Sequence, residues 1–205
     1  MSTETRLVVV CNECQVHWYS NAVPAKCADP AHGHQELEVH RHLSTVVLPD
    51  GTEVNAASFD DADPYRRERP PDYGLYLDRA WQPPWAHAHL DWPDFGVPAD
   101  VTGTVVGLTG ALGRARAGQR VELGCLGGHG RTGTALACLS VLGGLPAAEA
   151  VAWVRANYCT DAVETSEQEA FVAGLATDRL RRGAVTTRSS PSTPRLASPP
   201  ASPGA

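Results

Sequence analysis

A cysteine and an arginine stand at the two ends of a glycine-rich stretch. Residues 121–133 read VELGCLGGHGRTG, so that Cys125 and Arg131 enclose five residues. An apolar segment precedes Cys125, and apolar residues recur at helical spacing over 131–142, which places the cysteine in a turn between a strand and a helix. Backbone N–H groups of such a turn converge on one anion, and the start of the helix adds partial positive charge. The stretch therefore predicts a phosphate-binding loop with a nucleophile at its base.

These residue types suit phosphoryl transfer. The donors around Cys125 predict a thiolate, because the pKa of a cysteine at such a position falls from about 8.5 to roughly 3.5–7.5. The planar guanidinium of Arg131 can hold two oxygens of a phosphoryl group at once, which a lysine cannot do. The residues between them are the candidate phosphate cradle: Leu126, Gly127, Gly128, His129 and Gly130.

The pattern Cys-x5-Arg-Thr with its glycines resembles the signature of the cysteine-dependent protein tyrosine and dual-specificity phosphatases. The resemblance spans roughly residues 72–175. It implies an α/β cysteine-phosphatase fold, in which a central mixed sheet is flanked by helices and the site lies at the carboxyl end of a strand. It also implies a protein phosphatase that hydrolyses phosphotyrosine through a phosphocysteine intermediate, a route that requires no metal. Phosphoserine and phosphothreonine are further candidate substrates.

The segment DWPDFGVP at 91–98 resembles the mobile Trp-Pro-Asp loop of that family. The resemblance gives Asp94 the role of general acid for the leaving oxygen, a contribution of about 10²–10⁴-fold, and of general base for water in the second step. Asp91 has no counterpart in the motif and is predicted to be structural. Thr132 is expected to donate a hydrogen bond to the departing sulfur, the alternative being a structural hydroxyl at a helix start.

Thr165 and Gln168 begin a predicted helix and support two interpretations. The Thr-x-x-Gln spacing resembles the family segment whose glutamine positions the hydrolytic water. The same spacing is a capping box, in which the Thr hydroxyl and the Gln side chain satisfy backbone donors at the helix start. Both interpretations can hold together, so Gln168 is a candidate member of the catalytic machinery.

Two positions depart from the family or bear on the substrate. Most members have a histidine immediately before the nucleophile, where this chain has Gly124. His129 is the nearest replacement, the alternative being a loop histidine that faces solvent. Phosphoinositide-directed members have lysines where this chain has Leu126 and His129, which favours a phosphoprotein substrate. Six upstream aromatic residues are candidates for the wall of a phosphotyrosine pocket: Tyr65, Tyr73, Tyr76, Trp81, Trp85 and Trp92.

The N-terminal segment has the residue types and spacing of a small structural zinc site. The predicted ligands are three thiolates and one imidazole in tetrahedral array: Cys11, Cys14, Cys27 and His32. His34 is the alternative fourth ligand. A redox Cys-x2-Cys pair and incidental thiols are the other interpretations. His40 and His42 alternate along a predicted strand and are expected to face outward rather than bind metal.

Composition limits the remaining classes. The formal net charge of −6 over 205 residues gives no electrostatic signature of nucleic-acid binding. The apolar run at 7–10 is too short for a signal segment or a membrane span, so we expect a cytoplasmic protein whose six cysteines are thiols or metal ligands. Lys26 is the single lysine among 17 basic residues, which suggests a GC-rich bacterial coding sequence.

The chain divides into three parts in this interpretation: a cysteine- and histidine-rich element at 1–42, a phosphatase domain at 43–182 and a disordered Ser/Pro-rich tail at 183–205. Within the domain we expect a hairpin turned at 48–51, strands at 74–77, 85–90 and 121–124, and four helices. The helices are expected from Asp100 to about residue 117, from Arg131, from Pro146 to Tyr158 and from Ser166 to about residue 181.

Three functional classes follow from these motifs. An active phosphatase acting on a phosphorylated protein is favoured, because nucleophile, arginine and acid are all present. A pseudophosphatase that binds phosphoproteins with weak or no turnover, and a zinc-organised interaction module, are the alternatives. The sequence assigns no oligomeric state.

Overall fold

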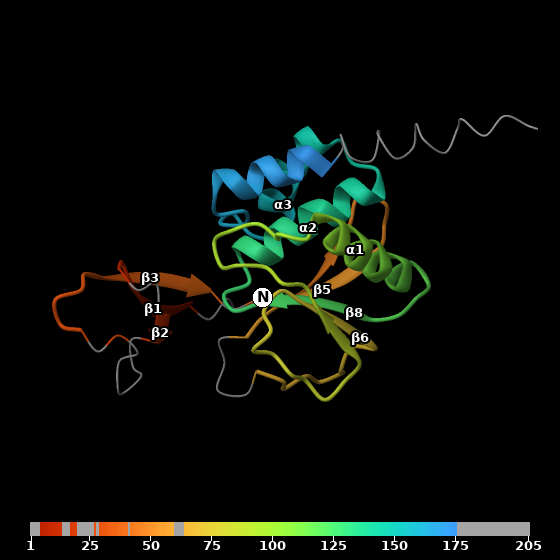
Figure 1. The fold of residues 1–205 in the computed structure, drawn as a ribbon. Coiled ribbons are helices and arrows are strands. Elements are labelled where there is room, and N and C mark those ends of the chain that lie inside the picture. Colours follow the sequence, from red (N-terminus) through yellow and green to blue (C-terminus); the bar gives the residue numbers. More distant parts are fainter. Residues whose placement is uncertain are drawn as a thin grey trace, which may run out of the picture.

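The computed structural model describes residues 5–13, 17–19, 27, 29–40, 42–59 and 64–175. These residues form two sheets and a group of helices (Figure 1). Cys14 and the predicted tail at 183–205 lie outside the described residues. Within the described ranges, no helix is both long and apolar enough to cross a bilayer.

The larger sheet is mixed and has five strands in the order β4-β5-β8-β6-β7. Their bounds are β4 (Leu43–Val47), β5 (Glu53–Ser58), β6 (Tyr73–Tyr76), β7 (His87–His89) and β8 (Val121–Cys125). Strand β4 pairs antiparallel with β5, and the other neighbouring strands are parallel. The prediction of a central mixed sheet flanked by helices is confirmed.

Strand β8 occupies the centre of this sheet because its sequence can be covered on both faces. All five of its residues are buried, as expected of a parallel strand inside an α/β layer. Its one charged residue, Glu122, accepts hydrogen bonds from Arg67 at 2.8 Å and from the Tyr76 hydroxyl at 3.0 Å. Parallel strands end at the same edge of a sheet, so Cys125 lies beside the residues that follow β6.

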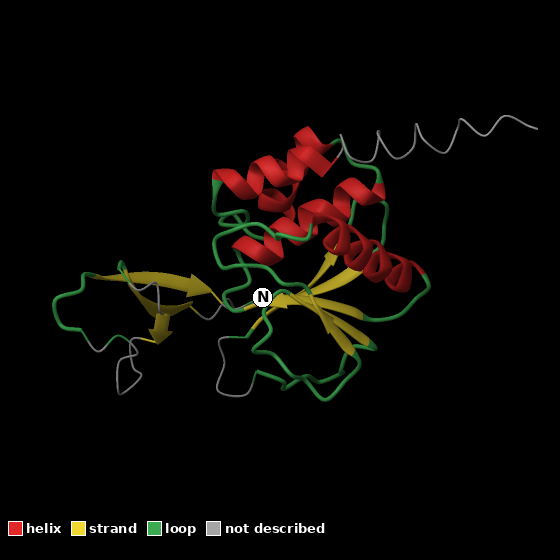
Figure 2. Cartoon of the chain, in the orientation of Figure 1, coloured by secondary structure: helices red, strands yellow, loops and turns green. Residues whose placement is uncertain are grey.

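Three helices lie on the same side of the larger sheet (Figures 1 and 2). They are α1 (Val101–Arg116), α2 (Gly130–Gly143) and α3 (Ala147–Asn157), and residues 166–175 are also helical. Helix α2 is buried along most of its length and packs against α1 and α3. The predicted cap of α1 is confirmed, since the Asp100 carboxylate accepts from Gly103 N at 2.8 Å.

The predicted hairpin turn and the predicted start of the helix at Pro146 agree with the structure to within one residue. The hairpin between β4 and β5 turns where expected, and Gly51 adopts a φ of 84°, in the left-handed region that favours glycine. Pro146 has a ψ of 132° and is the cap of α3, so the predicted helix began one residue early. Cys138 is buried on α2, as expected of a cysteine on a packed helical face.

The smaller sheet is antiparallel and has the order β2-β1-β3. Its strands are β1 (Thr5–Cys11), β2 (His17–Tyr19) and β3 (His34–His40). The sequence predicts a cysteine-rich element here but not this sheet. The pairing places Cys11 opposite His34, so candidate metal ligands gather where β1 ends and β3 begins. The domain boundaries after residues 42 and 182 stay a prediction.

Candidate active site

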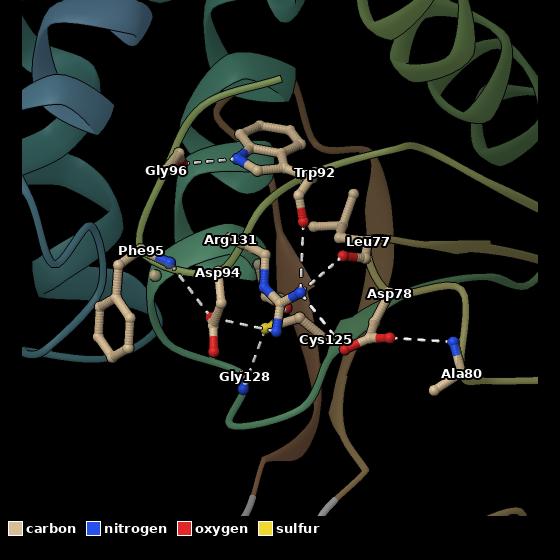
Figure 3. A network of polar contacts seen from close by, with 12 residues as sticks. Leu77, Asp78, Ala80, Trp92, Asp94, Phe95, Gly96, Cys125, Gly128 and Arg131 are labelled. Carbon is tan, nitrogen blue, oxygen red and sulfur yellow. Dashed lines mark hydrogen bonds and ion pairs between the residues drawn. The ribbon is translucent and has the colours of Figure 1, made fainter. Parts of the chain in front are cut away.

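Cys125 is the last residue of β8, and its sulfur faces donors of the following loop (Figure 3). Gly128 N donates to Cys125 Sγ at 3.2 Å, and Thr132 Oγ1 donates to the same sulfur at 3.0 Å. Gly128 adopts a φ of 82°, which glycine tolerates without strain. The loop predicted from the sequence is therefore folded around the sulfur, and the expected contact with Thr132 is present.

Two opposing influences act on the Cys125 thiol. Burial is the larger and raises its pKa, while Arg131, the Thr132 hydroxyl and the N–H groups of Thr132 and Gly128 act to lower it. The sequence predicts a lowered pKa from these donors. That prediction is wrong about the net direction, because it leaves out the cost of burying the thiolate.

Arg131 is held by backbone and carboxylate groups from two other segments (Figure 3). Its Nη1 donates to Leu77 O at 3.0 Å and to Trp92 O at 3.4 Å. The guanidinium also forms ion pairs with Asp78 at 3.3 Å and Asp94 at 3.1 Å. Asp78 was not among the predicted site residues, although its place two residues after the parallel strand β6 is a signal for a residue at the site edge.

One donor of Arg131 is left over. Its buried Nε has no hydrogen-bond partner among the described residues. Buried polar groups of folded proteins are nearly always paired, so an unpaired guanidinium donor indicates a missing acceptor. An oxygen of a phosphoryl group held over the loop is an acceptor of the right kind.

The segment around Asp94 is folded back on itself. The indole Nε1 of Trp92 donates to Gly96 O at 2.9 Å, and Trp92 is buried. Within this turn Asp94 Oδ1 accepts from Phe95 N at 3.2 Å and faces the guanidinium described above. Asp91, in contrast, has a side chain that is 80% exposed. The turn thus brings Asp94, and not Asp91, to the loop.

Gln168 links the helix at 166–175 to the Asp94 turn. Its backbone N donates to Thr165 Oγ1 at 3.2 Å, as in the predicted capping box. Its side-chain oxygen accepts from Glu164 N at 2.8 Å, and its Nε2 donates to Gly96 O at 3.3 Å. The capping interpretation is supported by these bonds, and the water-positioning role stays a prediction.

Glu164 lies beside the loop that follows Cys125, and it was not among the predicted site residues. Desolvation and the nearby charge of Asp94 raise its pKa from 4.5 to about 7, against the lowering influence of Arg131 and of the Gly130 N–H. A Cβ at Gly130 would overlap the Glu164 carboxylate. The carboxylate therefore shares donors with the phosphate cradle. Its position next to the Thr-x-x-Gln segment was the available signal.

Gly124 stands where the family has a histidine, and the structure gives a reason. A Cβ at Gly124 would lie 2.6 Å from Phe59 Cε2 and 2.9 Å from Ala57 O. The ring of Phe59 is buried and stacks on Trp81 with 3.9 Å between centroids. Phe59 thus occupies the space that a larger residue at position 124 would need.

Three of the six aromatic residues named as candidates for the pocket wall pack against other parts of the fold. Tyr76 and Trp92 are buried, and Trp81 packs on Phe59. Phe95, absent from the predicted set, is 38% exposed and directly follows Asp94 (Figure 3). Phe95 has a φ of 55°, which is unusual for a non-glycine residue. It belongs to the same turn as Asp94.

His129 is buried and contacts two residues from distant segments. Its Nδ1 lies 3.3 Å from His42 Nε2 and 3.4 Å from Cys159 Sγ. The interpretation of His129 as a solvent-facing loop residue is therefore wrong. The outward orientation expected of His42 is also wrong, because the ring packs against the phosphate loop and is 6% exposed. Cys159, which follows α3, is buried as well.

The N-terminal element brings together three of the four predicted zinc ligands. His32 Nδ1 lies 3.4 Å from both Cys11 Sγ and Cys27 Sγ. The other ring nitrogen of His32 is 3.4 Å from an Asp29 carboxylate oxygen, an arrangement that turns Nδ1 toward the sulfurs. Among the described residues this group contains His32 and not His34.

Sequence comparison finds short matches. No family model matches the chain. An uncharacterized protein of Methanocaldococcus jannaschii, MJECL20, is 48% identical over 63 residues, which cover 31% of this chain and 42% of that protein. A second uncharacterized protein of the same organism, MJ0215, is 50% identical over 54 residues, covering 26% of this chain and 33% of that protein. The chain thus spans less than half the length of these curated relatives.

Solved structures with similar architecture are phosphatases. Kinase associated phosphatase aligns with a TM-score of 0.54 at 16% identity, covering 69% of this chain and 96% of that one. A mouse dual specificity phosphatase complexed with zinc tungstate aligns with a TM-score of 0.54 at 12% identity, covering 68% and 89%. PTPMT1 in complex with PI(5)P aligns with a TM-score of 0.50 at 14% identity, covering 63% and 94%. The chain therefore has the fold of the protein tyrosine and dual-specificity phosphatases.

Proposed function

We propose that the protein is a protein phosphatase that transfers a phosphoryl group to Cys125 and then hydrolyses the phosphocysteine. The observation that carries this proposal is that a sulfur facing loop donors lies beside a buried guanidinium whose Nε has no partner among the described residues. The first group supplies a nucleophile and the second a partner for phosphoryl oxygens. The fold, shared with known phosphatases, supports the same chemistry.

In the first step the Cys125 thiol gives its proton to solvent, the thiolate attacks phosphorus, and the bond to the leaving oxygen breaks. The loop N–H groups and Arg131 hold the nonreacting oxygens and the charge that develops on them. Asp94 is ion-paired with Arg131 at 3.1 Å. A phosphoryl dianion competes for that guanidinium, which releases the Asp94 carboxyl to take up a proton and pass it to the leaving oxygen.

In the second step water attacks the phosphocysteine and the sulfur leaves. Asp94, now ionised, takes the proton from water, and inorganic phosphate is formed. The hydrogen bond from Thr132 Oγ1 to Cys125 Sγ, 3.0 Å long, stabilises the departing thiolate. Gln168 is placed by its bond to Gly96 O next to the Asp94 turn, where it can help to position the water.

Phosphotyrosine in a protein is the substrate that the surroundings favour. Leu126 and His129 stand where phosphoinositide-directed phosphatases have lysines, and the imidazole of His129 is engaged by His42 and Cys159. The exposed ring of Phe95 follows the acid and offers an apolar surface to a substrate ring. We expect Phe95→Ala to raise KM for a phosphotyrosyl peptide more than for a phosphoseryl peptide.

Phosphate release from a phosphotyrosyl peptide and from an aryl phosphate tests the proposal. Wild type and Cys125→Ser should be compared across pH after both are shown to be folded. We expect turnover by wild type and none by the variant. Folded wild type that releases no phosphate from either substrate would instead favour a phosphoprotein-binding pseudophosphatase.

We also propose that the N-terminal element holds a structural Zn²⁺ ion through Cys11, Cys27 and His32, with Cys14 as the fourth ligand. The clustering of the first three ligand atoms within 4.8 Å supports this assignment. A metal would stabilise a short three-stranded sheet whose buried apolar cluster, among the described residues, consists of Val9, Cys11 and Cys27.

Metal analysis and thermal unfolding test the N-terminal assignment. Chelation should lower the unfolding temperature of wild type, and Cys11→Ser should lose one equivalent of zinc and most of that sensitivity. Cys138→Ser, which removes a buried thiol of α2 outside this element, is the matched control. Equal zinc content in wild type and Cys11→Ser would contradict the assignment of Cys11 as a zinc ligand.

A further inference from the structure

A second group of metal-ligand side chains lies beside the phosphate loop. His42 precedes β4, His129 is within the loop and Cys159 follows α3. One ligand atom from each of the three residues lies within 4.8 Å of the other two. Each residue is 6% exposed. The fold thus buries, at one point, three ligand residues from widely separated segments.

The spacing of these atoms fits a tetrahedral ion. His129 Nδ1 lies 3.3 Å from His42 Nε2 and 3.4 Å from Cys159 Sγ. Tetrahedral ligands of Zn²⁺ are about 3.3 Å apart for two nitrogens and about 3.6 Å apart for nitrogen and sulfur, given bonds of about 2.05 and 2.3 Å. The two imidazole planes meet at 81°, so both rings can direct a nitrogen at one point without stacking.

The donor set selects the kind of metal. Imidazole nitrogen and thiolate sulfur suit Zn²⁺, whereas Mg²⁺ and Ca²⁺ prefer oxygen ligands. Three protein ligands leave a fourth position for water. We propose that His42, His129 and Cys159 bind one Zn²⁺ ion, and that this ion holds the phosphate loop in its folded arrangement.

The loop contacts this group through Gly128, the residue that precedes His129. Gly128, which donates to the Cys125 sulfur, accepts a hydrogen bond from the Tyr158 hydroxyl at 2.6 Å. A Cβ at Gly128 would lie 2.8 Å from His42 Cδ2, so backbone and imidazole are in close contact. Because the loop N–H groups and the ligand nitrogen belong to adjacent residues, fixing His129 on a metal also restricts those N–H groups.

Zinc binding here does not depend on the proposed phosphatase activity, whereas its effect on the loop rests on that function. The two are measured separately. The host for both measurements is the full chain carrying Cys125→Ser, which removes the nucleophile as a competing zinc ligand.

The first measurement counts bound Zn²⁺ by titration against a chromophoric chelator. We expect Cys159→Ser and His42→Gln, each in the host chain, to lose one equivalent that Cys138→Ser retains. Cys11→Ser should lose a different equivalent, and Co²⁺ in that chain should give the absorption spectrum of a tetrahedral site with one thiolate. Unchanged stoichiometry in both Cys159→Ser and His42→Gln would overturn the site and leave a hydrogen-bonded polar cluster.

The second measurement is the affinity of the host chain for inorganic phosphate with and without Zn²⁺. We expect zinc to tighten phosphate binding at least threefold in the host chain and not in its Cys159→Ser derivative. A zinc equivalent that is lost in Cys159→Ser without any change in phosphate affinity would retain the site and overturn its effect on the loop. Phosphate that does not bind under either condition would count against the proposed function, independently of the zinc count.

Discussion

Cys125 and Cys159 are both buried thiols, but their neighbours differ in kind. Cys125 is surrounded by donors, namely the Gly128 N–H, the Thr132 hydroxyl and the Arg131 guanidinium. Cys159 also faces backbone N–H groups, those of Asp161 and Ala162, but in addition it lies beside the ring nitrogen of His129, with His42 next to it. Burial is the largest influence on both thiols and raises the pKa of each.

The comparison teaches that burial alone does not assign a cysteine its chemistry. Donors stabilise a thiolate and, in the same place, the oxygens of a phosphoryl group, so they favour a nucleophile. Imidazole nitrogens can bind a cation together with a thiolate, so the two histidines beside Cys159 favour a metal ligand there. The same kind of substitution or ligand should therefore affect Cys125 and Cys159 differently.

The largest expected difference is in turnover. Cys125→Ser should lower kcat by at least about 10⁴-fold, since it removes the nucleophile. Cys159→Ser should stay within about threefold of wild type when both proteins are assayed without metal. Phosphate release from an aryl phosphate measures both. Comparable losses in the two variants would break the distinction between the cysteines.

A smaller loss is expected when Asp94, which is ion-paired with Arg131, is removed. Asp94→Ala should reduce kcat by about 10²–10³-fold, with the greatest effect on substrates with basic leaving groups. Asp91→Ala is the matched control, because that carboxylate is 80% exposed and paired only with the exposed Arg79 in the described contacts. Equal effects of the two changes would indicate that the turn does not deliver Asp94 to the leaving oxygen.

Phosphate and Zn²⁺ should each protect a different one of the two thiols from alkylation. At a ligand concentration tenfold above its dissociation constant, inorganic phosphate should slow alkylation of Cys125 about tenfold, and Zn²⁺ should do the same for Cys159. Peptide mapping by mass spectrometry distinguishes the two thiols. Phosphate that protects Cys159 but not Cys125 would reverse their assignments.

Thr132→Ala removes one donor of the Cys125 set and leaves the Cys159 group untouched. The initial burst of product should persist, while steady turnover should slow about tenfold, because the hydroxyl assists departure of the sulfur. Rapid-mixing kinetics with an aryl phosphate separate the two phases. If both phases slow equally, the hydroxyl is structural.

The smallest expected effect is on pH dependence. Burial and Asp94 raise the pKa of Glu164 from 4.5 to about 7, so the carboxyl is neutral below that pH and ionised above it. Ionisation places negative charge beside the Gly130 N–H and should weaken phosphate binding about two- to fivefold as pH rises through 7. In Glu164→Gln this weakening should disappear. The same dependence in both proteins would assign it to another group.

The raised pKa of Glu164 also makes the stability of the folded chain depend on pH. A folded-state pKa above the unfolded value means that the folded chain binds the proton more tightly. The contribution of Glu164 to stability is therefore present below pH 4.5 and lost as pH rises toward about 7. Glu164→Gln should accordingly gain stability relative to wild type at pH 8 more than at pH 4.

The sequence predicted those parts of the site whose geometry is local. The spacing of Cys125, Arg131 and Thr132 is set by one strand, one loop and one helix start, so the residue pattern alone determines their arrangement. The same holds for the hairpin at Gly51 and the cap at Asp100. In the N-terminal element, Cys27 and His32 are five positions apart, and their grouping was likewise expected.

Contacts across distant segments could not be predicted in this way. His42 and His129 are 87 positions apart in the sequence. They meet only because the segment that leads into β4 lies next to the phosphate loop in the folded chain. Asp78 reaches Arg131 through the pairing of β6 with β8. The net pKa of Cys125 also depends on burial by the whole domain, which the loop sequence does not contain.

The most direct test of the central claim is detection of the phosphoryl group on Cys125 itself. Asp94→Ala mixed with an aryl phosphate and quenched in acid within the first turnovers should accumulate the covalent intermediate, because its hydrolysis lacks a base. Mass spectrometry should then find a phosphoryl group on the peptide that contains Cys125 and none in a Cys125→Ser, Asp94→Ala control. Product release by Asp94→Ala with no phosphorylated Cys125, or with the group on another residue, would contradict the account.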